Sequence, residues 1–289
     1  MNPEDYALQQ ALISSAVINY VLTFAKYFVS PALTVADWLK VLSLLYPEVA
    51  QRREEAAELA RRFYDSQREL EHPDLPAVAR KLVPYEYKWF VQNMEPARVK
   101  MSQEESPADA VTTLALRAVR EVENAGRRQI IGAVQDDPET KIIRGWARVA
   151  TGRETCAWCL MLISRGPVYL GADTAGLDLP DNVATRMIAA GEDVSEYMEQ
   201  WHDGCDCKVV PVFKGEGWYG EAAANRALEL WNEATLEAHR IHDSDPTKHP
   251  SGKNKGKTMT LNQEALNALR RKLARGEIDP SEFAALAAA

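Results

Sequence analysis

Cysteine is scarce in this chain and is confined to one region. The 289 residues include four cysteines, Cys156, Cys159, Cys205 and Cys207. A disulfide-stapled secreted domain is usually short and follows a signal peptide, whereas the first residues here are acidic and lack a basic segment. We therefore expect folding in a reducing cytosol, which favours metal binding by the thiols over disulfides.

An excess of positive charge and a long apolar run are also absent. Lys and Arg number 34 against 42 Asp and Glu, so any nucleic-acid contact needs a local basic segment. The uncharged run 11–25 is shorter than the roughly 20 apolar residues that span a bilayer. Because Ser14, Ser15 and Asn19 interrupt it, we expect a buried helix and no membrane partner; membrane contact is the alternative.

Motifs of several enzyme classes are missing too. The sequence has no phosphate-binding loop, dinucleotide fingerprint or zinc-protease helix motif. Zinc deaminases need an upstream His-x-Glu, but the only histidine before the cysteines, His72, is followed by Pro-Asp. A nucleophilic cysteine with His202 as its base is conceivable, although neighbouring thiols favour ligation. We expect no catalytic residues; the alternative is a metal-dependent hydrolase acting on nucleic acid.

The cysteines and one histidine form a metal-ligand pattern. A soft cation such as zinc takes four nitrogen or sulfur donors. The five candidate ligands are Cys156, Cys159, His202, Cys205 and Cys207. Ligation by both clusters would close a long loop, as in a structural zinc site, and would leave one candidate, His202 or Cys207, outside the coordination sphere. Alternatively, these are small buried residues and one polar loop histidine.

Hydrophobic periodicity predicts that the first half is helical. The expected helices are 7–29, 35–45, 48–69, 76–93 and a long one from Pro107 to about Val134. Thr34 is the expected N-cap of the second helix, which should end before Pro47. The segment 95–107 is expected to be a linker.

Four arginines lie on the predicted outer face of the long helix. They are Arg117, Arg120, Arg127 and Arg128. Because Glu121 and Glu123 are interspersed with them, we interpret this as a solvated face with balanced charges.

The second half changes in character. Short strands are expected at 142–150, 166–170 and 208–213, and helices at 156–164, 182–190 and 219–239. Capping patterns at Thr260 and Asp279 predict two more helices. The low-complexity segment 243–257 is interpreted as a flexible tether, with weak, salt-dependent DNA contact as the alternative. Its candidate contact residues are Lys248, Lys253, Lys255 and Lys257.

Together these features predict an α+β protein that is predominantly α-helical. A helical N-terminal domain is joined to a small mixed module with a short β-sheet, stapled by the Cys/His cluster. The predicted divisions are a helical domain at 1–95, a linker and long helix at 96–140, the Cys/His module at 141–242, a lysine-rich linker at 243–259 and C-terminal helices at 260–289.

Three segments of the module resemble the phage Mu F-like minor head protein family, in the version found in tailed phages of actinobacteria. They are WARVATGRETCAWC at 146–159, RGPVY at 165–169 and WHDGCDCKVVPVF at 201–213. The family pattern is a tryptophan-bearing strand, an arginine before Cys-x-x-Cys, and His-x-x-Cys-x-Cys before a proline-containing strand. The resemblance implies that Trp146 and Arg153 support the site structurally. The insertion 171–200 departs from the pattern.

The resemblance implies a low-copy minor capsid protein in the interior of the virion head, which acts in head morphogenesis without catalysis. Its expected partners are the portal protein, capsid or scaffold proteins and packaged DNA, and its expected cofactor is a structural zinc ion. A cytosolic zinc-binding adaptor is the remaining alternative.

Overall fold

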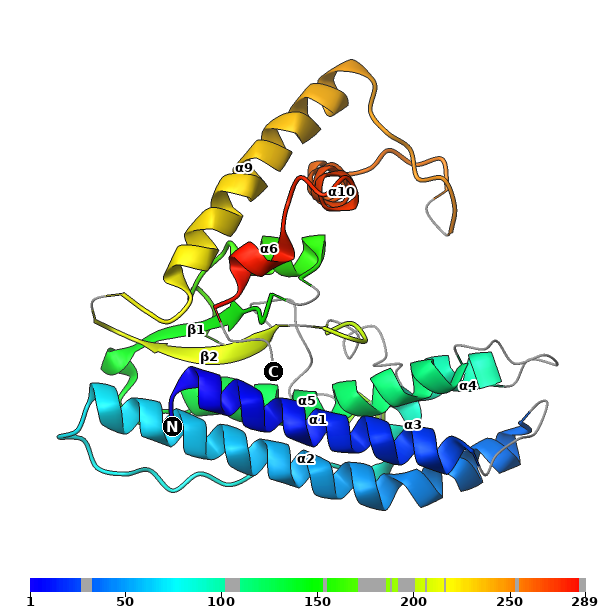
Figure 1. Cartoon of the computed structure of the whole chain (residues 1–289), viewed down its shortest axis with the longest axis vertical. Helices are drawn as coiled ribbons and strands as arrows, with labels where there is room; N and C mark the ends of the chain where they lie inside the picture. Colours follow the sequence, from blue (N-terminus) through cyan, green and yellow to red (C-terminus); the bar gives the residue numbers. More distant parts are fainter. Residues whose placement is uncertain are drawn as a thin grey trace. The chain divides into compact units, whose positions relative to one another are not determined.

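Figure 1 shows the computed structural model of the chain. It describes residues 1–289 except 27–32, 102–109, 153–154, 171–185, 188, 192–200, 206, 216, 253–254 and 286–289. The fold is α+β and predominantly helical, as predicted, with one two-stranded sheet in the described part. The chain forms two compact units, Met1–Gly145 with Tyr169–Cys205, and Trp146–Val168 with Asp206–Ala288.

Three long helices build the first unit. They are α1 (Pro3–Ala25), α2 (Val35–Glu71) and α5 (Ala110–Gln135), which pack against one another side by side (Figure 1). Thr34 caps α2 as predicted, in a capping box with Asp37. The core between the helices is apolar and includes Val17, Leu42 and Val122.

Pro47 does not end a helix. The predicted break is wrong, because α2 runs from Val35 through Pro47 to Glu71 without interruption. Proline removes one helical hydrogen bond, but Leu45 and Val49 on either side are fully buried. Packing of these side chains outweighs the local preference.

The segment between α2 and α5 also differs from expectation. The predicted helix over 76–93 is reduced to α3 (Tyr87–Asn93), and 78–86 has no regular structure. The predicted linker contains a helix instead, α4 (Glu95–Met101). Its buried residues Ala97 and Met101 belong to the core, which explains why a proline-containing stretch becomes helical.

The arginines of α5 are not on a solvated face, so that prediction is wrong. Arg120 and Arg127 are each 2% exposed, and Arg128 is 9% exposed. Burial raises the pKa of Glu121, but the neighbouring Arg120 and Arg53 outweigh this and hold the pKa below its ordinary value. The charges of α5 therefore form buried ion pairs.

The second unit contains the strands and the C-terminal helices. Its elements are β1 (Ile143–Val149, of which the first three residues belong to the other unit), α6 (Ala157–Ile163), β2 (Lys208–Phe213), α9 (Glu221–Ser244), α10 (Leu261–Ala274) and a short 3-10 helix (Pro280–Phe283). β1 and β2 pair in an antiparallel sheet. Alanines of α9 and α10 allow these helices to pack closely (Figure 1).

Some second-half predictions need correction or lie outside the described residues. The expected strand at 166–170 is a single bridge residue, Tyr169. Most of the expected helix at 182–190 falls outside the described residues. The predicted capping box at Thr260 is confirmed, with Gln263 as its partner. Between α9 and α10 the backbone is closed by hydrogen bonds, including His249 N–H to the Lys257 carbonyl at 3.0 Å.

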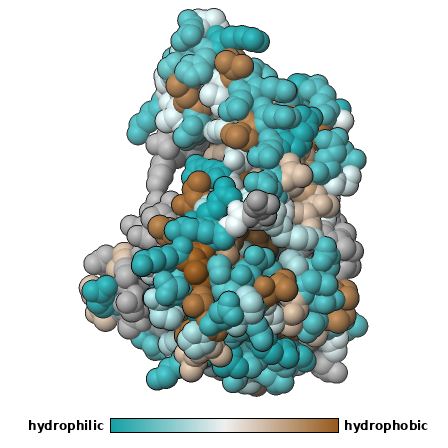
Figure 2. All heavy atoms as spheres, turned by 90° about the vertical axis from the view of Figure 1, so that its left-hand side faces the viewer, coloured by the Kyte–Doolittle hydropathy of each residue, from teal (hydrophilic) through white to brown (hydrophobic). Residues whose placement is uncertain are grey.

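One helix of the described part, α1, is long and apolar enough to meet a membrane-spanning criterion of length and composition. It packs on α2 and α5 through one face, so the expectation of a buried helix holds for that face alone. Its opposite face carries Leu8, Leu12 and Leu22, which are 50%, 63% and 41% exposed. Hydrophobic residues also reach the face drawn in Figure 2 at several separate places among hydrophilic ones.

Candidate metal centre

The first two candidate ligands lie at the start of α6. Cys156 is the N-cap residue, with extended backbone, and its Sγ accepts a hydrogen bond from the Cys159 N–H at 3.4 Å. The helical turn therefore brings the Cys159 side chain to the same side as Cys156. An N–H directed at sulfur stabilises a thiolate, the form that binds metal.

Cys207 is fixed by the sheet. It directly precedes β2 and is fully buried, as is Cys159. Val209, also fully buried, holds the beginning of the strand in the core. A thiol at this position has little freedom to move, so its direction is set by the strand.

His202 and Cys205 lie in a tight turn. The Cys205 N–H donates to the His202 carbonyl at 3.1 Å, and Gly204 has a φ of +72°, which favours glycine. The His202 Nδ1 lies 3.0 Å from the Asp203 carbonyl oxygen. With the proton on Nδ1, this nitrogen donates to the carbonyl and leaves the Nε2 lone pair for a metal ion, the usual arrangement of a ligating histidine.

The five predicted ligands gather into two overlapping groups. The ligand atoms of Cys156, Cys159 and His202 lie within 4.8 Å of one another, and so do those of Cys159, Cys205 and Cys207. Sulfur ligands around tetrahedral zinc are about 3.8 Å apart, so the donors within each group of three are close to the spacing that a shared ion requires. Cys159 belongs to both groups and is the central residue of the set.

The donor chemistry fits zinc. The four thiols are free cysteines, and only Cys156 among them is more than slightly exposed. Soft thiolates with one imidazole suit zinc rather than the oxygen-seeking magnesium or calcium ions. An excess of protein donors is typical of a closed structural site, which leaves no position for a reactive water.

The other predicted residues lie as follows. Trp146 is fully buried on β1, whereas Arg153 is outside the described residues. Lys248, Lys255 and Lys257 are exposed in the turn between α9 and α10, and Lys253 is outside the described residues.

Sequence reasoning missed the contribution of α5 to this region. Arg117 Nε lies 2.8 Å from Asp203 Oδ2, next to the candidate ligand His202. The signal for this contact was present as an aspartate between two ligands and a row of arginines earlier in the chain. Nothing in their spacing links them, because the two segments meet only in the folded unit.

Comparison with known proteins gives the class of this chain. It belongs to the VG15 protein family, which matches residues 4–234. It is therefore a member of a phage protein family, and the match spans both the helical first unit and the Cys/His region.

Two curated relatives come from mycobacteriophages. The Gene 15 protein of Mycobacterium phage D29 is 52% identical over 281 residues, covering 94% of this chain and 99% of the relative. The Gene 15 protein of Mycobacterium phage L5 is 50% identical over 300 residues, covering 98% and 99%. No solved structure matches this chain.

Proposed function

We propose that this protein is a minor head protein, which assembles at low copy number at or near the portal and acts in head morphogenesis. The observation that carries the proposal is the gathering of the Mu F-like Cys/His set in one place, in a chain of a phage family. Membership of the family supports the phage context, and the resemblance of 141–213 to Mu F-like proteins supports the role in the head.

The Cys/His set holds a structural zinc ion in this proposal, and the protein has no catalytic activity. Cys159 is a ligand, since it belongs to both groups, and the other ligands come from Cys156, His202, Cys205 and Cys207. The ion would hold α6 and the start of β2 in their places. Metal analysis of the purified full chain is expected to find one zinc ion per chain, and hydrolysis of DNA or RNA by the zinc-loaded protein is expected to be undetectable.

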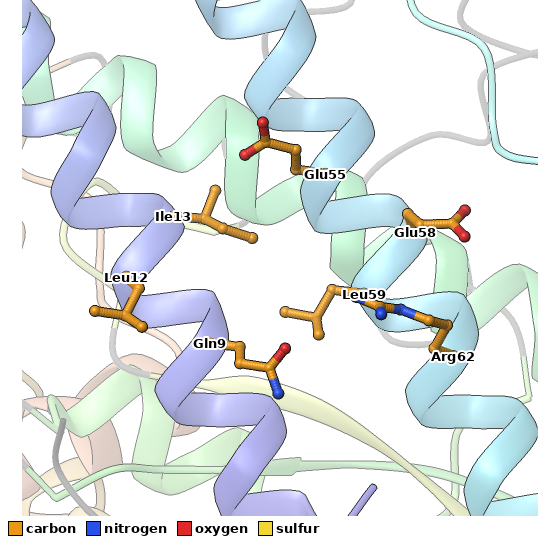
Figure 3. A pocket seen from close by; sticks show the side chains of 7 residues that line it. All are labelled: Gln9, Leu12, Ile13, Glu55, Glu58, Leu59 and Arg62. Atoms are coloured by element: carbon orange, nitrogen blue, oxygen red, sulfur yellow. The ribbon is translucent and has the colours of Figure 1, made fainter.

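The outward face of α1 and the adjoining groove form the portal-docking surface in this proposal. The groove lies between α1 and α2, has a volume of about 350 Å³ and is lined by Gln9, Leu12, Ile13, Glu55, Glu58, Leu59 and Arg62. Ile13 and Leu59 point toward each other across it (Figure 3). Exposed apolar side chains beside such a groove favour an apolar helix as the occupant. Glu55 and Glu58 are paired with Arg52 and Arg61 of α2, so the edge of the groove carries balanced charge.

The decisive experiment counts this chain in virions and in empty heads by quantitative mass spectrometry, against the portal and major capsid proteins. Low copy number in both kinds of particle is the expected result. Absence from both would exclude a head protein and favour a cytosolic zinc-binding adaptor.

A substitution tests the docking surface. Leu12→Asp on α1 is compared with Leu236→Asp on α9, because these leucines are similarly exposed, at 63% and 60%. We expect Leu12→Asp to reduce incorporation into heads several-fold and Leu236→Asp to leave it unchanged. Equal incorporation of both variants would exclude the α1 face as the docking surface.

A further inference from the structure

We infer that Arg120 and Arg127 of α5 are positioning residues for the metal centre: they hold the turn that carries His202 and Cys205 in its ligating conformation. The inference rests on the zinc site proposed above. It concerns residues that sequence patterns placed on a solvated surface, and it follows from contacts within the first unit.

Arg127 contacts both ends of the turn, Trp201 and Cys205. Its guanidinium carbon lies 4.1 Å from the centre of the Trp201 ring, and its Nη2 donates to the Cys205 carbonyl at 3.5 Å. The same group is fixed on its own helix by Glu123, at 2.8 Å, and by the Asn124 side chain, at 2.9 Å. A guanidinium held in this way can stack its planar face on the Trp201 ring and donate an N–H to the Cys205 carbonyl.

Arg120 contacts the first residue and the middle of the turn. Its Nη1 donates to the Trp201 carbonyl at 3.5 Å, and its Nε lies 3.8 Å from Asp203 Oδ1. Arg117 holds the other carboxylate oxygen of Asp203 at 2.8 Å. The carbonyl of the same Asp203 faces the imidazole Nδ1 of His202 at 3.0 Å. A continuous set of contacts therefore runs from α5 to a candidate metal ligand.

Burial makes these contacts effective. Arg120, Arg127 and Trp201 are 2%, 2% and 1% exposed, so water competes little for their polar groups. Glu121, 1% exposed, lies 3.6 Å from both Arg120 and Arg53 and balances their charge. Buried arginines that carry partners on two sides fix geometry more firmly than exposed ones do.

The turn needs this support. Gly204 has a left-handed backbone conformation. Glycine loses more conformational freedom on folding than any other residue, so fixing this turn is costly in entropy. Without the contacts from α5, metal binding itself would have to order His202 and Cys205, and this would reduce the net free energy of binding. Outer contacts of this kind typically contribute about 10–100-fold in metal affinity.

The test measures metal affinity and stability separately. Zinc affinity of the full chain is measured by competition with a chromogenic chelator, and the coordination geometry by the absorption spectrum of the cobalt-substituted protein. The variants are Arg127→Ala, Arg127→Lys and Arg120→Gln. The control is Arg68→Ala, a buried arginine of the same unit whose partners are Asp137 and the Pro76 carbonyl.

We expect Arg127→Ala and Arg120→Gln to weaken zinc binding by about 10–100-fold and to change the cobalt spectrum. Arg127→Lys, which keeps the charge but not the planar stacking, should lie between Arg127→Ala and the wild type. Arg68→Ala should lower the melting temperature without changing the affinity. Wild-type affinity in Arg127→Ala and Arg120→Gln, or an equal loss in Arg68→Ala, would overturn the positioning role alone. A wild-type chain that binds no metal would overturn the metal centre as well.

Discussion

Arg68 and Asp137 form a buried ion pair between α2 and the residues that follow α5, with Arg68 Nε 2.9 Å from Asp137 Oδ2. The same oxygen accepts a hydrogen bond from the Tyr64 hydroxyl at 2.9 Å and lies 2.7 Å from Arg80 Nη2. Burial raises the pKa of Asp137, but hydrogen bonds from the Glu139 N–H, Tyr64 and Arg68 outweigh it and hold the pKa below its ordinary value.

This carboxylate should make the first unit sensitive to acid. Because its folded pKa is lowered, Asp137 contributes stability above its unfolded pKa of about 3.9, and this stability is lost as the pH falls through the folded pKa. We expect Asp137→Asn to cost about 3 kcal/mol at pH 7 and to reduce the dependence of stability on pH below about 4. Urea unfolding between pH 7 and pH 3 measures both effects. An unchanged pH dependence in the variant would show that other carboxylates, such as Glu121, dominate.

Removal of the proposed zinc ion should affect the region around α6 and leave the helices of the first unit in place. We expect Cys159→Ser to lose zinc and to lower the melting temperature of this region, because Cys159 belongs to both ligand groups. Metal analysis and thermal unfolding measure the two effects, hydrogen exchange locates the destabilised region, and chelator treatment of the wild type should reproduce them. Met161→Leu, a buried non-ligand change on α6, is the control and should keep its zinc. Full zinc content in Cys159→Ser would show that Cys159 is not a ligand.

Two glycines of α5 should respond to alanine in opposite directions. A Cβ at Gly126 would lie 3.0 Å from the Tyr6 hydroxyl and 3.4 Å from the Ala56 carbonyl, whereas one at Gly132 would meet nothing within 4 Å. Gly126→Ala is expected to destabilise the protein by about 1–3 kcal/mol through overpacking. Gly132→Ala should stabilise it by about 0.5–1 kcal/mol through helix propensity. Equal effects in denaturant unfolding would contradict the close approach of α1, α2 and α5.

Pro47 offers a test of the uninterrupted α2. Its side chain is exposed, so Pro47→Ala loses little packing and restores an N–H for the helical hydrogen bond. We expect a net gain of about 1–2 kcal/mol, since the removed helix penalty exceeds the entropy gained by the unfolded chain. Pro3→Ala, at the first position of α1, restores no helical hydrogen bond and loses buried contacts, so it should not stabilise the protein. A destabilised Pro47→Ala would indicate that the helix is distorted at this residue.

Local signals in the sequence were sufficient for part of this fold. Thr34 and Thr260 cap helices as predicted, because capping depends on residues three positions apart. The cysteine spacing pointed to residues that do gather in space. Each cap, and each of the two Cys/His clusters taken by itself, is encoded in a few neighbouring positions.

Long-range packing decided the features that sequence reasoning missed. Pro47 stays within a helix because the residues beside it are in the core. The α5 arginines looked solvated because their partners, such as Asp203, come much later in the chain. A helix that is buried on most of its sides with paired charges has the same local pattern as an exposed one, so periodicity could not separate the two.

The turn between α9 and α10 has a practical value for labelling this chain. Its backbone closes on itself, and a side chain at Gly252 would meet nothing within 4 Å. A short epitope inserted beside Gly252 should leave both helices folded, since surface turns tolerate added residues well. An antibody to the epitope would then detect the folded chain without a change in the core of either helix.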